Sequence, residues 1–208
     1  MRAAEGLHWR WQPGACALVA ALVFMGVAAL TYAPMAEVAF RSDGSPVAWL
    51  SSAQLWALGL LCLQLGGQRL LPRALAAWLA LAMALMAFDE QFMWHEQWKH
   101  GCPLGPGWCA HGWVRELPMA LVALLGVGSA GWLHRSLPTR AARATLWAAI
   151  AMGLWALLLD QTEAPAALAP YEEGFEVLAE ALFGAALLGL TCIHPAGPAP
   201  AGTTRRPR

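Results

Sequence analysis

Three acidic residues and a histidine stand at the end of an apolar stretch, in the segment FDEQFMWHEQWKH at residues 88–100. These residues are Asp89, Glu90, His95 and Glu96. Carboxylates and imidazole rings bind divalent metals and act as general acids and bases. An ionised side chain in hydrocarbon costs at least about 2.5 kcal/mol, so such residues usually face a bundle interior, a partner or a pathway. The segment is therefore the first candidate for a functional site.

A second acidic segment opens the last apolar stretch of the chain. Its four glutamates are Glu172, Glu173, Glu176 and Glu180. At about 100° per residue they fall on one arc of a helix, roughly 100° wide. Negative charge near a helix N-terminus is favourable, so the first two of them could serve only to start the helix. The two deeper glutamates are harder to explain in that way.

Acids from three apolar stretches are expected at one level of the membrane. We estimate depth by counting from the basic residues at the other end of each stretch, at about 1.5 Å of rise per residue. Asp89, Asp160 and Glu176 reach nearly the same depth, and Glu180 lies about 6 Å deeper than Glu176. The pattern predicts a shared acidic cup, with a structural polar network between helices as the alternative.

The composition indicates an all-α membrane protein. Of 208 residues, 59% are hydrophobic and 12% are charged, whereas a soluble domain carries about 25% charged residues. We expect about six transmembrane helices in a single domain, residues 1–194, followed by a disordered basic tail, residues 195–208. The first apolar stretch is long for a signal peptide, which favours a retained helix. The expected helices cover about 15–33, 50–65, 74–94, 117–133, 144–160 and 171–193.

Charge patterning predicts the orientation. With both termini in the cytoplasm, ten of the thirteen Lys and Arg residues lie on the cytoplasmic side, and only Arg41, Lys99 and Arg115 lie outside. The same topology places every acid except Glu5 in the outer half or the outer loops. We therefore expect a multi-pass protein of the bacterial inner membrane, surrounded by membrane lipid. The chain has no basic stripe of the kind that binds nucleic acid.

The acidic cup predicts an outward-facing cation site. We expect Asp89, His95, Asp160 and Glu176 to bind a divalent metal, although His95 can join Asp89 only if the helix unwinds near Trp94. An oxygen-rich ligand set favours Mg²⁺, Ca²⁺ or Mn²⁺, and histidine shifts the preference towards Zn²⁺. The alternatives to a bound metal are protonated acids or basic groups that fold over the cup.

The sequence leaves three functions open. The first is a metal-dependent hydrolase of a lipid-like substrate, with Glu90 or Glu180 as the catalytic base. The second is a proton- or cation-coupled transporter in which Glu180 is the deepest relay point. The third is a non-catalytic assembly subunit, either in a homo-oligomer or docked to a basic periplasmic segment.

A loop rich in Pro and Gly separates Cys102 from Cys109 in the sequence CPLGPGWC. The predicted topology places this loop outside the cytoplasm, where a disulfide between the two cysteines is one alternative and two free thiols are the other. Zinc binding by the pair together with His100 and His111 is a further alternative, although the spacing matches no standard zinc motif.

The acidic motifs carry two resemblances. An Asp-Glu followed by a His-Glu at a helix end, with a later Glu-Glu-x-x-Glu, resembles small bacterial polytopic membrane proteins of unassigned activity. The matching residues are Asp89, Glu90, His95, Glu96, Glu172, Glu173 and Glu176. More loosely, a small helical bundle with Asp and His near one membrane face resembles alkaline-ceramidase-like hydrolases, which implies zinc-dependent lipid hydrolysis. Their several intramembrane histidines are missing here, so no catalytic residue is carried over.

Overall fold

The chain forms an all-helical bundle. A computed structural model describes residues 12–40, 44–101, 104, 106–161 and 171–191. These residues form eight α-helices and one 3₁₀-helix, and no strand is found among them. The elements are α2 (Gln12–Thr31), η2 (Ala36–Ala39), α3 (Pro46–Gly67), α4 (Arg73–Phe92), α5 (Trp94–Gly101), α6 (Pro106–Cys109), α7 (Gly112–Ser136), α8 (Arg140–Gln161) and α9 (Glu172–Leu188).

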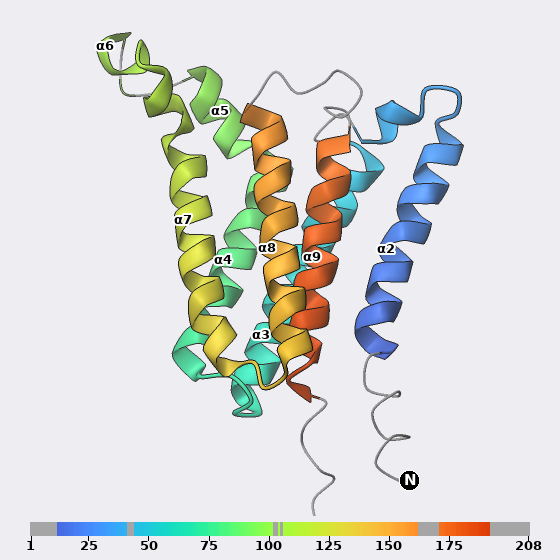
Figure 1. Cartoon of the computed structure of the whole chain (residues 1–208). Helices are drawn as coiled ribbons and strands as arrows, with labels where there is room; N and C mark the ends of the chain where they lie inside the picture. The colour runs from blue at the N-terminus through green and yellow to red at the C-terminus, as the bar shows by residue number, and fades with distance from the viewer. Residues whose placement is uncertain (1–11, 41–43, 102–103, 105, 162–170, 192–208) are drawn as a thin grey trace, which may run out of the picture.

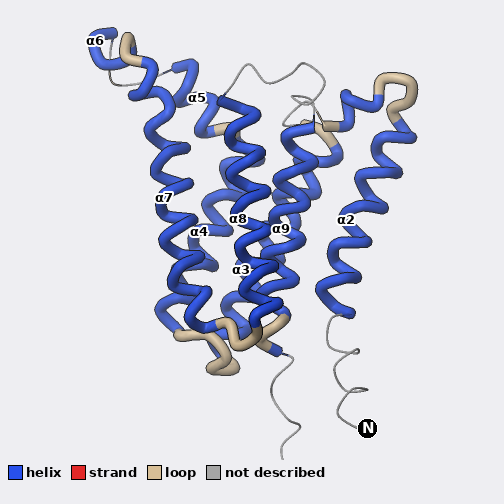
Figure 2. The backbone as a smooth tube through the Cα atoms, viewed as in Figure 1, coloured by secondary structure: helices blue, strands red, loops and turns tan. Residues whose placement is uncertain are grey.

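The long helices run alternately up and down, so that α2 begins and α9 ends at the same end of the bundle (Figures 1 and 2). Five of them, α2, α3, α4, α7 and α8, are long and apolar enough to cross a membrane. The sixth, α9, has 17 residues and is shorter than the expected helix over 171–193. The expected C-terminal tail, residues 195–208, lies outside the described part of the chain.

Helix α3 shows how local sequence sets a boundary. The apolar run predicts a start near Leu50, but the helix begins at Pro46, because proline fits the first helical position. The hydroxyl of Ser45 caps the helix by accepting a hydrogen bond from the N–H of Ala48 at 3.1 Å. The helix therefore begins about one turn earlier than hydropathy alone predicts.

Helix α9 is the central packing element, in contact with α2, α3 and α8. Small residues permit the close approach of α2: a Cβ atom added at Gly14 would lie 2.8 Å from the Cβ of Ala185. At the lower end in Figure 1, a core of Leu, Ala, Phe and Cys side chains joins α3, α4, α7, α8 and α9. Every side chain of that core is apolar, apart from the thiol of Cys62.

Two adjacent glycines at the end of α3 predict opposite responses to substitution. A Cβ at Gly66 would lie 2.6 Å from the Cβ of Ala76 on α4, whereas one at Gly67 meets no atom within 4 Å. We expect Gly66→Leu to lower the free energy of unfolding by about 1–3 kcal/mol, as overpacking does, and Gly67→Leu to leave it within about 0.5 kcal/mol. Thermal unfolding in detergent measures both, and equal losses would contradict the packing described.

Candidate cation site

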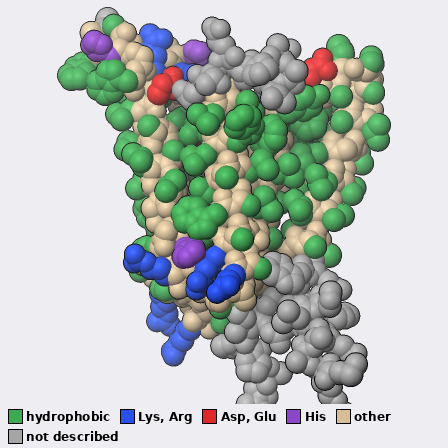
Figure 3. Space-filling view, in the orientation of Figure 1, with side chains coloured by type: hydrophobic (Ala, Val, Ile, Leu, Met, Phe, Trp, Pro, Cys, Tyr) green, Lys and Arg blue, Asp and Glu red, His purple; other side chains and the backbone are tan. Residues whose placement is uncertain are grey.

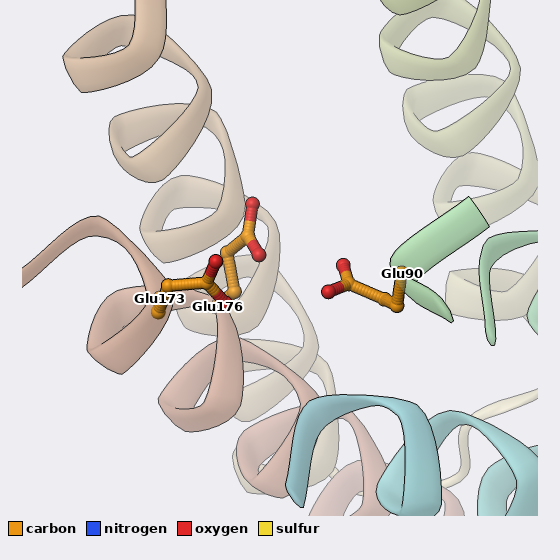
Figure 4. A group of neighbouring side chains, drawn as sticks. All are labelled: Glu90, Glu173 and Glu176. Carbon is orange, nitrogen blue, oxygen red and sulfur yellow. The ribbon is translucent and has the colours of Figure 1, made fainter. Parts of the chain in front are cut away.

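Three glutamates from two helices meet at the upper end of the bundle in Figure 1. Each of Glu90, Glu173 and Glu176 offers one carboxylate oxygen, and these oxygens lie within 4.8 Å of one another. Figure 4 shows Glu90 of α4 pointing across the gap towards the two glutamates of α9. All three side chains are partly buried. We call these three residues the glutamate triad.

A fourth carboxyl group lies next to the triad. Glu180, one helical turn beyond Glu176 on α9, interacts electrostatically with all three triad residues. Its Oε1 accepts a hydrogen bond from the hydroxyl of Ser51 on α3 at 2.8 Å. Its Oε2 is buried and has no hydrogen-bond partner among the described residues. Four carboxyl groups this close cannot all remain charged unless a cation, protons or basic side chains offset their repulsion.

The positions of these residues follow from helix geometry. Glu173, Glu176 and Glu180 are spaced by three and four residues, so α9 presents them on one face, as the sequence predicts. Because α9 packs against α3, that face also meets Ser51. Glu90 arrives in the last turn of α4.

The helix that carries Asp89 ends earlier than expected and allows a second pairing. Helix α4 stops at Phe92, and Met93 adopts the left-handed conformation with φ 52°, so α5 starts in a new direction. The Asp89 carboxylate accepts hydrogen bonds from the backbone N–H of His95 at 3.0 Å and from its Nδ1 at 2.8 Å. Asp89 thus satisfies a free donor at the start of α5 and holds the imidazole ring.

His95 is the positive centre of this pair. The hydrogen bond to Asp89 raises the pKa of His95 to about 9, helped by the charges of Asp89, Glu96 and Glu90 and opposed by burial. Glu96 lies 3.7 Å from the Nε2 of His95 and 2.9 Å from the Nε2 of His100. A protonated imidazole has no lone pair to offer a metal, so the ring acts here as a countercharge.

The residues that were expected to bind one metal do not all lie together in the structure. Glu176 lies in the triad together with Glu90, for which the sequence predicted a role as base. Asp89 and His95 form their own pair at the start of α5. Asp160 is in the last turn of α8, but its side chain lies outside the described residues. Glu180 lies next to the triad on its deeper side, as the depth count predicts.

Two residues of this region were absent from the expected site. For Glu173 the sequence left open a role only in starting the helix, and it placed this residue on the same face as Glu176 without including it among the expected ligands. Nothing in the sequence singled out Ser51 as a site residue. A serine hydroxyl in an apolar helix can donate its hydrogen bond to a backbone carbonyl of its own helix as easily as to a distant side chain. Its pairing with Glu180 depends on how α3 meets α9.

The expected cysteine pair is described only in part. Cys109 is disulfide-bonded. Cys102, its expected partner, lies outside the described residues. Among the described cysteines, Cys16 and Cys62 are free thiols.

The fold defines a class of all-helical protein with five helices suited to cross a membrane. The family described as "Domain of unknown function (DUF8692)" matches residues 15–190, which run from the first turn of α2 to just beyond the end of α9. The chain therefore belongs to the DUF8692 family. No curated protein and no solved structure matches the chain.

The Asp89–His95 pair predicts a pH-dependent stability. Because the folded pKa of His95 is above its ordinary value of 6.5, the stabilisation is complete below about pH 6.5 and is lost as the pH rises through about 9. We expect Asp89→Asn to unfold more easily than the parent at pH 6.5 by about 1–3 kcal/mol, with the gap closing by pH 10. Thermal unfolding across pH 6–10 tests this, and a gap that stays constant would contradict the pairing.

Proposed function

We propose that this protein is an integral membrane protein that binds a hard divalent cation through the glutamate triad. The observation that carries the proposal is the meeting of the Glu90, Glu173 and Glu176 oxygens within 4.8 Å of one another. Three carboxylates that are held together by the packing of two helices repel one another, and a divalent cation removes that repulsion.

The donor atoms fit a cation of calcium size. Two oxygens bound to one Ca²⁺ at about 2.3–2.6 Å can stand up to about 5 Å apart, so three oxygens within 4.8 Å of one another can bind the same ion. All three donors are carboxylate oxygens, and His95 is already paired with Asp89. This set suits Ca²⁺ or Mn²⁺ better than Zn²⁺, which prefers nitrogen and sulfur ligands.

Glu180 places a further carboxyl group on the deeper side of the site. Its partnerless Oε2 lies in a buried position and is stabilised when a cation occupies the triad. Beyond it, the lower core of the bundle is built from apolar side chains and Cys62. This arrangement supports a site that is entered from one end of the bundle, and it lends no support to a path for ions through it.

Charge distribution supports the placement in a cell. We propose six transmembrane helices, with α9 as the sixth, and both termini in the cytoplasm of a bacterium. In Figure 3 most Lys and Arg side chains gather at the lower end, while acidic side chains and a smaller basic group lie at the upper end, and a hydrophobic belt separates the two ends. With the basic end inside, the triad faces the periplasm.

Removing one triad carboxylate should weaken cation binding. We expect the detergent-purified protein to bind one Ca²⁺, and Glu176→Gln or Glu90→Gln to lower the affinity at least about tenfold, which is about 1.4 kcal/mol. Equilibrium dialysis with Ca²⁺ measures the affinity and the stoichiometry.

Glu96→Gln is the matched control. Glu96 is in α5, just beyond the end of α4, and it pairs with His100. Because Glu96 does not belong to the triad, this variant should retain the affinity of the parent. A protein that binds no divalent cation while folded, or triad variants that bind like the parent, would overturn the proposal.

The link between Ser51 and Glu180 gives a second test. Glu180→Gln removes a carboxyl group that can ionise next to a bound cation, so we expect the Ca²⁺ affinity to fall about tenfold, and Ser51→Ala to lower it less. Ser52→Ala is the control on the same helix, because the Ser52 hydroxyl donates to the backbone oxygen of Ala87 at 3.1 Å. If Glu180→Gln leaves the affinity unchanged while lowering the melting temperature, Glu180 is only a structural residue.

A second candidate function is hydrolysis of a lipid-like ester or amide that depends on the bound cation. The free oxygen of Glu180 next to the triad favours it, because a carboxylate there could accept a proton from water. The water oxygen would attack the carbonyl carbon, the bond to the leaving oxygen or nitrogen would break, and that atom would take the proton. Release of fatty acid from defined lipids in the presence of Ca²⁺, abolished in Glu180→Gln, tests this activity.

A further inference from the structure

The turn between α3 and α4 carries a basic hollow at the opposite end of the bundle from the triad. A shallow hollow of about 410 Å³ is lined by Arg69, Leu70, Leu71, Pro72 and Arg73. No acidic side chain is among these described lining residues. Both guanidinium groups therefore contribute positive charge to one small space, at the level where two spans end.

An apolar furrow continues from this hollow along the outside of α3 and α4. It has a volume of about 230 Å³ and shares Arg73 with the basic hollow. The other lining residues are Leu63, Gly66, Gly67, Ala76 and Ala77. Small residues on both helices line much of this furrow, and α3 and α4 approach each other closely where Gly66 meets Ala76.

The backbone at Arg69 is unusual for its residue type. Arg69 has φ 59°, a left-handed conformation that glycine adopts freely and that costs other residues free energy. Its N–H donates to the carbonyl of Gly66 at 3.2 Å, so it ends α3 in the position where glycine is usual. This strained backbone makes a functional role of the Arg69 side chain a hypothesis to test.

We propose that this turn binds an anionic phospholipid, with its phosphate between Arg69 and Arg73 and one acyl chain in the furrow. Charge complementarity identifies the headgroup, since planar guanidinium groups bind phosphate oxygens in pairs. The furrow favours a lipid over a free phosphate, because its apolar surface begins at Arg73 and could hold an acyl chain. This site is independent of the glutamate triad and of the proposed cation.

Native mass spectrometry of the detergent-purified protein with equal amounts of phosphatidylglycerol and phosphatidylcholine tests the proposal. We expect preferential phosphatidylglycerol adducts, and at least a fivefold loss of them in the double variant Arg69→Gln/Arg73→Gln. The matched control is Arg135→Gln/Arg140→Gln, which removes two charges from the α7–α8 turn at the same end. Equal losses in both double variants would show adsorption to basic charge in general and overturn the site.

A second variant tests the acyl chain separately from the charge. Gly67→Leu fills the furrow at a position where an added Cβ meets no atom, and it should lower phosphatidylglycerol binding several-fold. Gly126→Leu on α7, also at an open position, should not lower it. If inorganic phosphate displaces the lipid completely and Gly67→Leu binds like the parent, the turn binds a free anion and the lipid proposal is wrong.

Discussion

Carboxylates repel one another at one end of this apolar bundle, and the folded protein has to offset that repulsion. Glu90, Glu173 and Glu176 are brought within 4.8 Å of one another by two helices that also bury Glu180 next to them. Water screens this charge less than it does on an exposed surface, so the folded bundle is stabilised by positive charge or by protons there. The cation site that we propose is the simplest solution that the donor atoms offer.

The two ends of the helices have different roles: the lower ends form the apolar core, and the upper ends carry the polar groups. The lower core, with Leu65, Leu75, Leu133 and Leu187 fully or almost fully buried, holds α3, α4, α7 and α9 together. The upper ends can therefore carry polar groups without loss of the bundle. Asp89 illustrates the result, because it joins α4 to α5 through His95 instead of adding a further negative charge to the triad.

The sequence predicted the long helices well because apolar length and charge bias are local properties, but it did not predict the short helices α5 and α6. It also placed Glu176 and Glu180 on one face of α9, since helical spacing is fixed. It placed Glu90 at the site only as a candidate base, and it did not predict that Ser51 would hold Glu180, because that contact depends on how α9 sits against α3. Helix α4 was expected to end at Trp94 but ends at Phe92, where Met93 takes a left-handed conformation. The sequence could not predict this end, because methionine is not a residue type that favours the left-handed conformation. The unwinding that His95 needed to reach Asp89 is present.

The most direct test of the central claim is pulsed electron paramagnetic resonance of Mn²⁺ bound to the purified protein in place of Ca²⁺. We predict one bound Mn²⁺ per chain, released by excess Ca²⁺, with no modulation from a histidine nitrogen, since the triad supplies only oxygen ligands and His95 is paired with Asp89. Strong nitrogen coupling would show that a histidine joins the site. A folded protein without any bound Mn²⁺ would contradict the proposed cation site.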